Sequence, residues 1–158
     1  MLIAKFSSLR DEWDVIAWEK TALDLAERAG ITVPGRRTYP VPVCDVAIHN
    51  TDDHLRNHGF LRADGGWAPS PVFDINPNPD IGVRRELAIG VGIDPADGIL
   101  ALREVAPSFG VDRLVDEEIL NEVFDATRSW RECAGINGLP ARELSLMEDA
   151  FAPHFSLR

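Results

Sequence analysis

The hydrophobic pattern at the start of the chain predicts a short strand followed by a helix. Residues 2–6 alternate with a period of two, as expected for a strand. Residues 14–29 carry apolar side chains at spacings of three and four, which gives a helix one apolar stripe. Gly30 then supplies the left-handed residue that commonly ends a helix. The residues of the stripe are Trp18, Ala22, Leu25 and Ala29.

Turn-forming residues divide the middle of the chain. Residues 33–42 hold three prolines and two arginines and are expected to be irregular. Residues 43–48 are apolar around Asp45, and their pattern fits either the end of a helix or a buried strand. An Asp-Gly-Gly turn between two apolar pairs predicts a hairpin over residues 60–68. The Asn-Pro-Asn-Pro-Asp run at residues 76–80 predicts a loop.

The rest of the chain predicts three helices. Asp97 can cap the first, which ends near Pro107. Asp116 is expected to cap the second, over residues 117–134, and Pro140 is a favoured first residue for the third. The whole pattern predicts an α+β fold with a small N-terminal strand and helix and a mainly α-helical C-terminal lobe. The side chains expected to face inward are Leu102, Val105 and Ala106 in the first helix, Ile119, Leu120, Val123, Phe124, Thr127 and Trp130 in the second, and Leu144, Met147 and Phe151 in the third.

Length and composition indicate one globular domain. The chain has 158 residues, of which 45% are hydrophobic, and that share supports a packed core. Its formal net charge is −10 and its pI is about 4.7. Such acidity argues against direct binding to nucleic acid phosphates. Contact with DNA through a partner protein is compatible with this charge.

The cysteines and the hydrophobic stretches favour a cytoplasmic protein. Cys44 and Cys133 belong to no CxxC pair and to no Cys/His zinc spacing. Two reduced thiols are therefore expected, and a single disulfide is the weaker alternative. Residues 1–6 lack the long apolar stretch of a signal peptide. No window approaches about 18 uninterrupted apolar residues, so no membrane span is expected.

Three side chains in the middle of the chain are spaced for phosphoryl transfer. This reaction needs a carboxylate that takes or orients the proton of the attacking hydroxyl, and oxygen ligands for Mg²⁺. In protein kinases the base Asp and an Asn ligand are five residues apart, and a second Asp ligand follows a hairpin. Asp52 and Asn57 have this separation, and Asp74 follows the predicted hairpin. We therefore predict Asp52 as the base and Asn57 and Asp74 as the magnesium ligands.

Other interpretations of this segment have less support. Asp53 is four residues from the asparagine rather than five, so it is the less favoured base. The Asn-Thr-Asp-Asp run could be a simple polar turn, although Asp74 and the hairpin argue against that. No register gives the alternating ligands, central glycine and terminal glutamate of an EF-hand. A zinc site or a small hydrolase could use His49, His54 and His58, but a further ligand and a helical face are lacking.

Lys5 and Glu19 form a second expected pair. A kinase lysine lies on a strand, binds phosphates and pairs with a glutamate on the following helix. Lys5 lies on the predicted strand, and Glu19 lies in the first half of the next helix, beside the buried stripe. Taken alone, Lys5 fits an ordinary surface lysine, and the downstream motif favours the functional role.

The chain resembles the HipA-like serine/threonine kinases, the toxin components of bacterial toxin–antitoxin systems. Residues 50–57 match the N-x-D-x-H-x-K-N catalytic loop of these kinases, with Arg56 where lysine is common. Residues 68–74 resemble the A-P-x-Y-D metal segment, with an extra residue and with Phe73 in place of the tyrosine. The lysine strand and the helix after it match less specifically.

This resemblance implies a set of site residues, cofactors and partners. ATP and Mg²⁺ are the implied cofactors, a protein hydroxyl is the implied acceptor, and a DNA-binding helix-turn-helix antitoxin is the implied partner. Catalytic roles are implied for Asp52, His54 and Asn57, with His54 holding the loop through hydrogen bonds. The residues implied to bind the nucleotide and its metal are Lys5, Glu19, Asn57 and Asp74.

Spacing within the chain predicts a shortened kinase domain. Only 33 positions separate Glu19 from Asp52, too few for the rest of the small sheet, the adenine-binding hinge and the main helix of the large lobe. About 20 helical residues span only about 30 Å. Weak ATP binding is therefore expected, and the alternative is an inactive remnant that binds an antitoxin or a full-length kinase. Residues 1–158 are expected to form this single, incomplete domain. Its expected parts are a small-lobe remnant at 1–32, a junction at 33–42, and the catalytic loop and helical lobe at 43–158.

Overall fold

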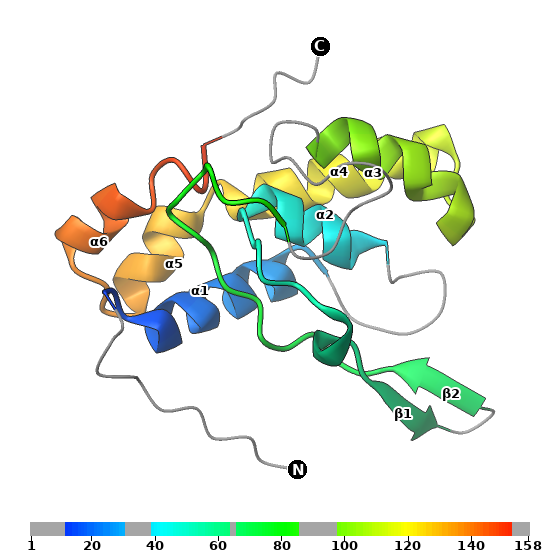
Figure 1. The fold of residues 1–158 in the computed structure, drawn as a ribbon, viewed down its shortest axis with the longest axis horizontal. Helices are drawn as coiled ribbons and strands as arrows, with labels where there is room; N and C mark the ends of the chain where they lie inside the picture. Colours follow the sequence, from blue (N-terminus) through cyan, green and yellow to red (C-terminus); the bar gives the residue numbers. More distant parts are fainter. Residues whose placement is uncertain (1–11, 31–38, 64–65, 86–97, 153–158) are drawn as a thin grey trace.

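The computed structural model describes residues 12–30, 39–63, 66–85 and 98–152. Within these ranges the chain is mainly helical and has one two-stranded antiparallel hairpin (Figure 1), which is compatible with the predicted α+β class. The predicted strand at residues 2–6, with Lys5, and the predicted cap Asp97 lie outside the described residues. In chain order the elements are α1 (Val15–Arg28), α2 (Pro40–Ala47), η1 (Leu55–Asn57), β1 (Phe60–Ala63), β2 (Gly66–Pro69), α3 (Gly98–Val105), η3 (Ala106–Phe109), α4 (Arg113–Thr127), α5 (Trp130–Ile136) and α6 (Ala141–Leu146).

Helix α1 forms where the apolar stripe predicts it. Asp14 precedes the helix, and its Oδ1 accepts the N–H of the residue three positions later at 3.0 Å, as an N-cap carboxylate does. Gly30 follows the helix with a φ of +67°, a conformation that glycine adopts without a Cβ clash. The stripe turns Trp18, Ala22 and Leu25 into the core, where all three are buried.

Helix α2 corrects the expectation of an irregular segment. Pro40 and Pro42, which were expected to prevent regular structure, lie in its first turn. The first backbone N–H groups of a helix have no acceptor within the helix, so proline loses no hydrogen bond there. The helix continues through residues 43–47, all of which are buried. The apolar run around Asp45 is therefore the end of a helix and not a strand.

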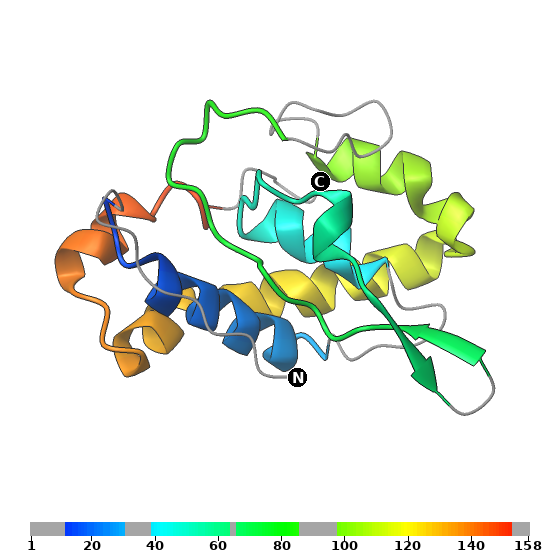
Figure 2. The same ribbon diagram turned by 60° about the horizontal axis from the view of Figure 1, so that its bottom comes forward.

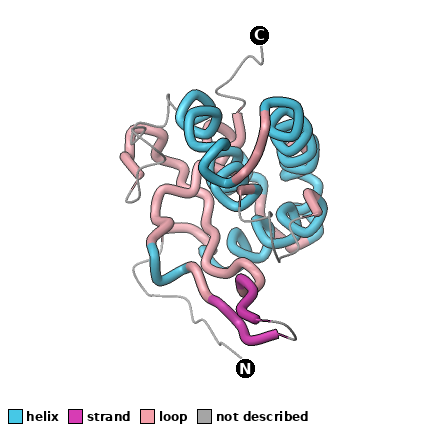
Figure 3. Tube along the Cα trace, turned by 90° about the vertical axis from the view of Figure 1, so that its right-hand side faces the viewer, coloured by secondary structure: helices cyan, strands magenta, loops and turns pink. Residues whose placement is uncertain are grey.

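The hairpin forms where the Asp-Gly-Gly turn predicts it. Strands β1 and β2 pair from Phe60 opposite Pro69 to Ala63 opposite Gly66. The hairpin projects from the helical body (Figure 3), and Phe60 is 63% exposed. Residues 70–85 then return along the helical body, past α1 and the loop after α2 (Figure 2). This return segment contains no helix or strand, which confirms the loop predicted at residues 76–80.

Helix α4 begins earlier than the sequence pattern predicts. Its N-cap is Asp112, whose Oδ1 accepts two backbone N–H groups of the first turn at 3.0 Å each. Asp116, the predicted cap, lies inside the helix, where it is buried and its carboxylate accepts a hydrogen bond from the Tyr39 hydroxyl. The predicted single helix also divides, since α4 ends at Thr127 and α5 begins at Trp130.

The remaining C-terminal elements lie where the sequence pattern predicts them, although α6 (Ala141–Leu146) is shorter than the predicted helix and ends before Met147 and Phe151. The turn η3 contains Pro107 and ends at Gly110, which has a φ of +69°. Helix α6 begins directly after Pro140, whose fixed φ suits the entry to a helix. Met147 and Phe151 are buried, as predicted for the inward side of this last segment.

The core is built around α4, which packs against both α1 and α2, and α5 extends the contact with α1. An aromatic cluster of Trp18, Trp130 and Phe151 joins α1, α5 and the chain after α6. The rings of Trp130 and Phe151 are stacked, with centroids 4.7 Å apart. Cys44 and Cys133 are buried free thiols, as predicted. Among the described residues, every helix is too short or too polar to cross a membrane.

Candidate active site

The loop that follows α2 leaves the helix through a defined turn. The N–H of Asn50 donates to the carbonyl of Asp45 at 2.8 Å, and the N–H of His49 donates to the carbonyl of Val46 at 3.3 Å. These two bonds form a Schellman C-cap, in which His49 is the left-handed residue with a φ of 54°. That conformation costs a non-glycine residue roughly 1–3 kcal/mol. Surrounding contacts must therefore hold the backbone at the start of the loop.

The return segment supplies such contacts. Nε2 of His49 lies 3.1 Å from the carbonyl oxygen of Asp80, and the His49 carbonyl accepts the Asn78 N–H at 3.1 Å. Nδ2 of Asn78 donates to the Thr51 hydroxyl oxygen at 2.8 Å. Sequence reasoning assigned residues 76–80 only to a loop and missed this function. The sequence signal for this role is the side-chain amide of Asn78, which lies in a proline-rich loop shortly after the predicted metal segment at residues 68–74.

Asp52 and Asp53 have different surroundings. Asp52 is exposed, and its N–H donates to Oδ1 of Asn50 at 3.4 Å. Oδ2 of Asp53 lies 3.0 Å from Nε2 of His58, and the two side chains form an ion pair when the imidazole is protonated. Asp52 is thus the more exposed of the two residues, and the Asp53 carboxylate is engaged by His58. The role of Asp52 as the base stays a prediction.

Asn57 joins the loop to the residue that follows the hairpin. It is buried, and its Nδ2 lies 3.5 Å from the carbonyl oxygen of Asp52 and 3.5 Å from that of Asp74. Its backbone N–H donates to the carbonyl of His54 at 2.8 Å, which closes the short turn η1. The fold thus brings together the three residues predicted as base and metal ligands.

Asp74 is held by contacts from two directions. Its backbone N–H donates to Oε1 of Glu19 on α1 at 3.1 Å, and its Oδ1 accepts Nδ2 of Asn76 at 3.2 Å. Asp74 has a φ of 60°, so it is the second non-glycine residue of the site with a left-handed backbone. Glu19 therefore contacts the residue predicted as a metal ligand, while its predicted pairing with Lys5 stays a prediction because Lys5 lies outside the described residues.

His54 is expected to hold the loop through hydrogen bonds, but none is made by its Nδ1 within the described residues. This atom is buried and has no hydrogen-bond partner in the described part of the chain. The bonds that hold the loop come from Asn50, Asn57 and Asn78 instead. A catalytic role of His54 stays a prediction.

Two groups near the loop have shifted pKa values. Burial raises the pKa of Asp45 to about 7, and the charge of Asp53 adds to the shift, while a hydrogen bond from Asn50 opposes it. The hydrogen bond with Asp53 raises the pKa of His58 above its usual value, although partial burial opposes this. Both shifts favour the protonated form of the group.

Comparison with protein families shows to which family the chain belongs. The family model described as the HipA-like C-terminal domain matches residues 36–131, more than half of the chain. The chain belongs to this HipA-like family. No curated protein and no solved structure matches the chain significantly.

The HipA-like match covers most of the candidate active site. It contains the loop at residues 50–57, the hairpin and Asp74, and it relates the chain to HipA-like toxins. Glu19 lies outside the matched residues, so the structure alone connects it with the site.

A pocket of about 280 Å³ lies beside Asn57 in the HipA-like region. Most of its lining is apolar, and its polar lining residues include the Asp53 and His58 pair. Asn57, one of the two predicted metal ligands, lines this pocket. The lining residues are Val41, Asp53, Asn57, His58, Gly59, Phe60, Pro69, Ser70, Pro71, Val72, Phe73 and Ile75.

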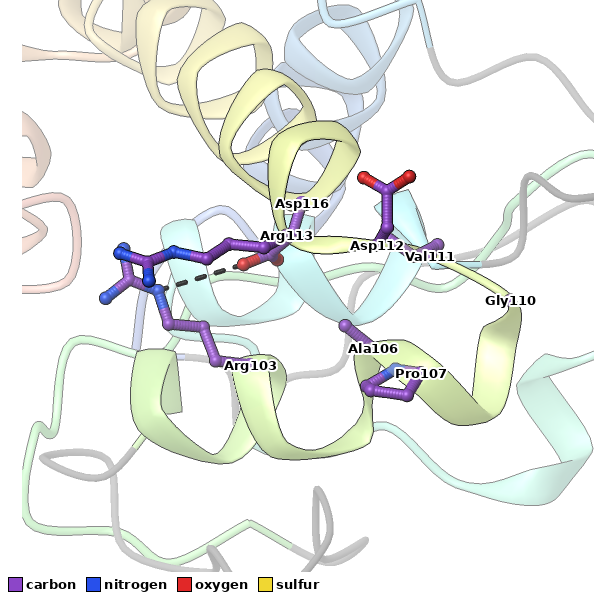
Figure 4. Close-up of a pocket in the computed structure, with 8 residues that line it drawn as sticks. All are labelled: Arg103, Ala106, Pro107, Gly110, Val111, Asp112, Arg113 and Asp116. Carbon is purple, nitrogen blue, oxygen red and sulfur yellow. Dashed lines mark ion pairs between the residues drawn. The ribbon is translucent and has the colours of Figure 1, made fainter.

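A second pocket, of about 700 Å³, lies between the α3–η3 segment and the start of α4 (Figure 4). Arg103 and Asp116 form an ion pair at its edge with 3.7 Å between Nε and Oδ2, and Arg113 extends to the same side (Figure 4). The carboxylate of Asp112 points away from this pair. None of the predicted site residues lines this pocket, so it is separate from the candidate active site.

Metal-binding clusters of the zinc type do not occur in the described ranges. There, no three His, Cys, Asp or Glu side chains gather closely enough to hold a metal ion. The zinc alternative therefore gains no support from His49, His54 and His58. The predicted magnesium pair differs in kind, because it combines the amide of Asn57 with the carboxylate of Asp74.

Proposed function

We propose that the chain is a HipA-type serine/threonine protein kinase that transfers a phosphoryl group from ATP, with Mg²⁺, to a protein hydroxyl. The observation that carries the proposal is the convergence of predicted residues from separate parts of the chain. Glu19 accepts the Asp74 N–H, and the Asn57 amide lies between the carbonyls of Asp52 and Asp74. A kinase-like fold with a shortened small lobe accounts for this arrangement.

The donor atoms of the proposed metal site suit Mg²⁺. Asn57 directs Nδ2 toward two backbone carbonyls, so Oδ1 is the atom that would hold the metal, together with the carboxylate of Asp74. Mg²⁺ prefers oxygen ligands and keeps several waters, so a few protein ligands suffice when phosphate oxygens complete the shell. When bound, the ion would neutralise charge on the phosphates of ATP.

Asp52 would act on the substrate hydroxyl. Its carboxylate is exposed, while its backbone contacts the side chains of Asn50 and Asn57. The hydroxyl oxygen would bond to the γ-phosphorus as the bond to ADP breaks, and Asp52 would take the hydroxyl proton. A positioned base of this kind contributes about 100-fold to 10,000-fold to the rate.

Several further roles belong to the same proposal. Lys5 would neutralise phosphate charge, and His54 would support the loop. A helix-turn-helix antitoxin is the proposed partner, and the cytoplasm is the proposed location. The net charge of −10 favours DNA contact through that partner rather than through this chain.

Transfer of labelled phosphate from Mg-ATP to the chain itself and to casein tests the proposal. We expect incorporation by the full chain and its loss in Asp52→Ala and Asp74→Ala. Glu132→Ala is the matched control and should retain activity, because this carboxylate on α5 is 68% exposed and outside the site. No incorporation by the wild-type chain, or incorporation that both site substitutions leave intact, would refute the kinase and favour the binding module.

Titration with Mg-ATP tests how tightly the chain binds the nucleotide. The short connection between Glu19 and Asp52 leaves little chain for an adenine-binding hinge, so we expect weak binding. Isothermal titration calorimetry measures it, and low-micromolar affinity of this chain alone would contradict the expectation.

A further inference from the structure

A buried carboxylate adjoins the start of the candidate catalytic loop. Asp45, in the last turn of α2, is 3% exposed, although burial of a carboxylate is costly unless hydrogen bonds compensate it. It makes two bonds to Asn50. Its carbonyl accepts the Asn50 N–H and its Oδ1 accepts the Asn50 Nδ2, both at 2.8 Å. The proposed chemistry makes no direct use of this carboxylate, so its burial requires another explanation.

Asn50 transmits this constraint to the predicted base. Asn50 is 1% exposed, and its Oδ1 accepts the Asp52 N–H at 3.4 Å. Because Asp45 holds Nδ2 of the same amide, the amide cannot turn without losing one of its two contacts. A continuous path therefore runs from the buried carboxylate on α2, through one side-chain amide, to the backbone of the base.

We propose that Asp45 is a positioning residue that acts through Asn50 to fix the backbone of Asp52. Two bonds from one residue tie the loop to a helix at two points, and a satisfied buried polar network of this kind makes a segment rigid. The catalytic consequence rests on the proposed kinase function. Displacement of a reacting group by about 1 Å can lower a rate about 100-fold.

Three variants separate positioning from a general loss of stability. Asp45→Ala removes the acceptor, whereas Asp45→Asn keeps an oxygen that can accept from Asn50. Glu143→Ala is the matched control, because Glu143 is a buried carboxylate that accepts hydrogen bonds from Trp18 Nε1 and from the Asp14 N–H, both at 3.1 Å. It lies in the aromatic core and outside the candidate active site.

Amide hydrogen exchange of residues 50–57 measures the positioning without an assay of activity. We expect exchange about tenfold or more faster in Asp45→Ala, and wild-type exchange in Asp45→Asn and Glu143→Ala. In the phosphotransfer assay, kcat of Asp45→Ala should fall about 100-fold with an unchanged KM for Mg-ATP. A purely structural role would lower only the folded fraction. Wild-type exchange and wild-type kcat in folded Asp45→Ala would overturn the inference.

A swapped pair decides the question if Asp45→Ala does not fold. Asn50→Asp sets two carboxylates against each other and should speed exchange in the loop. The double variant Asp45→Asn/Asn50→Asp again has one donor and one acceptor and should restore wild-type exchange, and no recovery would overturn the inference. An inactive wild-type chain would refute the kinase proposal, whereas the exchange comparison would still show whether Asp45 holds the loop.

Discussion

Oε1 of Glu19 accepts the backbone N–H of Asp74 at 3.1 Å, across 55 positions of the sequence. The bond joins α1 to the segment after the hairpin at a residue whose φ is 60°. A left-handed backbone at a non-glycine residue persists only where its surroundings favour it. Glu19 lies outside the residues that match the HipA-like family. Helix α1 therefore contributes directly to the geometry of the predicted metal ligand.

Substitution of Glu19 should weaken the fold through this bond. Glu19→Ala removes the acceptor of the Asp74 N–H, and the free energy of unfolding should fall by about 1–3 kcal/mol because the lost bond was made to a charged group. Glu19→Gln keeps an oxygen acceptor and should retain most of the stability. Urea denaturation of the wild type and both variants measures this difference. Equal stabilities of the two variants would show that the bond contributes little.

The Tyr39 hydroxyl should stabilise the first turn of α4. It lies 2.5 Å from Oδ1 of Asp116, and both residues are buried. Tyr39→Phe keeps the ring, including its contact with Phe109 at 5.5 Å between centroids, but removes a donor from a buried carboxylate. We expect the free energy of unfolding to fall by about 1–3 kcal/mol. Thermal unfolding measures the loss, and an unchanged Tm would contradict it.

The buried Asp45 should make stability depend on pH. Burial raises its pKa from 3.8 to about 7, so between these values the folded chain keeps a proton that the unfolded chain has released. The contribution of this group to the free energy of unfolding therefore falls as pH rises through that interval. Asp45→Asn lacks this titrating group. The free energy of unfolding of Asp45→Asn, relative to that of the wild type, should therefore increase as pH rises. Parallel pH profiles from urea denaturation would contradict the shift.

The imidazole of His58 should report its pairing with Asp53. The hydrogen bond between them raises the pKa of His58 above 6.5, because the carboxylate favours the protonated ring. Asp53→Asn should lower that pKa, whereas Asp52→Asn, which changes the neighbouring carboxylate, should leave it nearly constant. Titration of the His58 ring signals by NMR measures all three proteins. A pKa that responds equally to both substitutions would disprove the specific pair.

Local signals predicted the elements that depend on short-range chemistry. The apolar stripe of α1, the left-handed Gly30 and the pairing of β1 with β2 are each predicted by a few neighbouring residues, and the structure contains all three. The spacing of Asp52, Asn57 and Asp74 is likewise local, and the fold brings these residues together.

Contacts between distant segments explain what the sequence pattern could not predict. Asp112 caps α4, whereas Asp116, the predicted cap, lies inside the helix and accepts a hydrogen bond from the buried hydroxyl of Tyr39, which is far away in sequence. The role of Asn78 also depends on a distant segment, because its side chain contacts Thr51 through a long-range hydrogen bond. Pro42 suggested irregular structure because proline interrupts the interior of a helix. Its actual position, within the first turn of α2, could not be read from the sequence without knowing where the helix begins.

The central claim is that Asp52 is the base of a phosphotransfer site, and a comparison of Asp52→Asn with Asp53→Asn tests it most directly. The two carboxylates are adjacent, but one is exposed and the other is paired with His58. The measurement is kcat for phosphoryl transfer from Mg-ATP. The account predicts a loss of about 100-fold or more in Asp52→Asn and a rate close to that of the wild type in Asp53→Asn. Equal losses in the two variants, or a greater loss in Asp53→Asn, would contradict it.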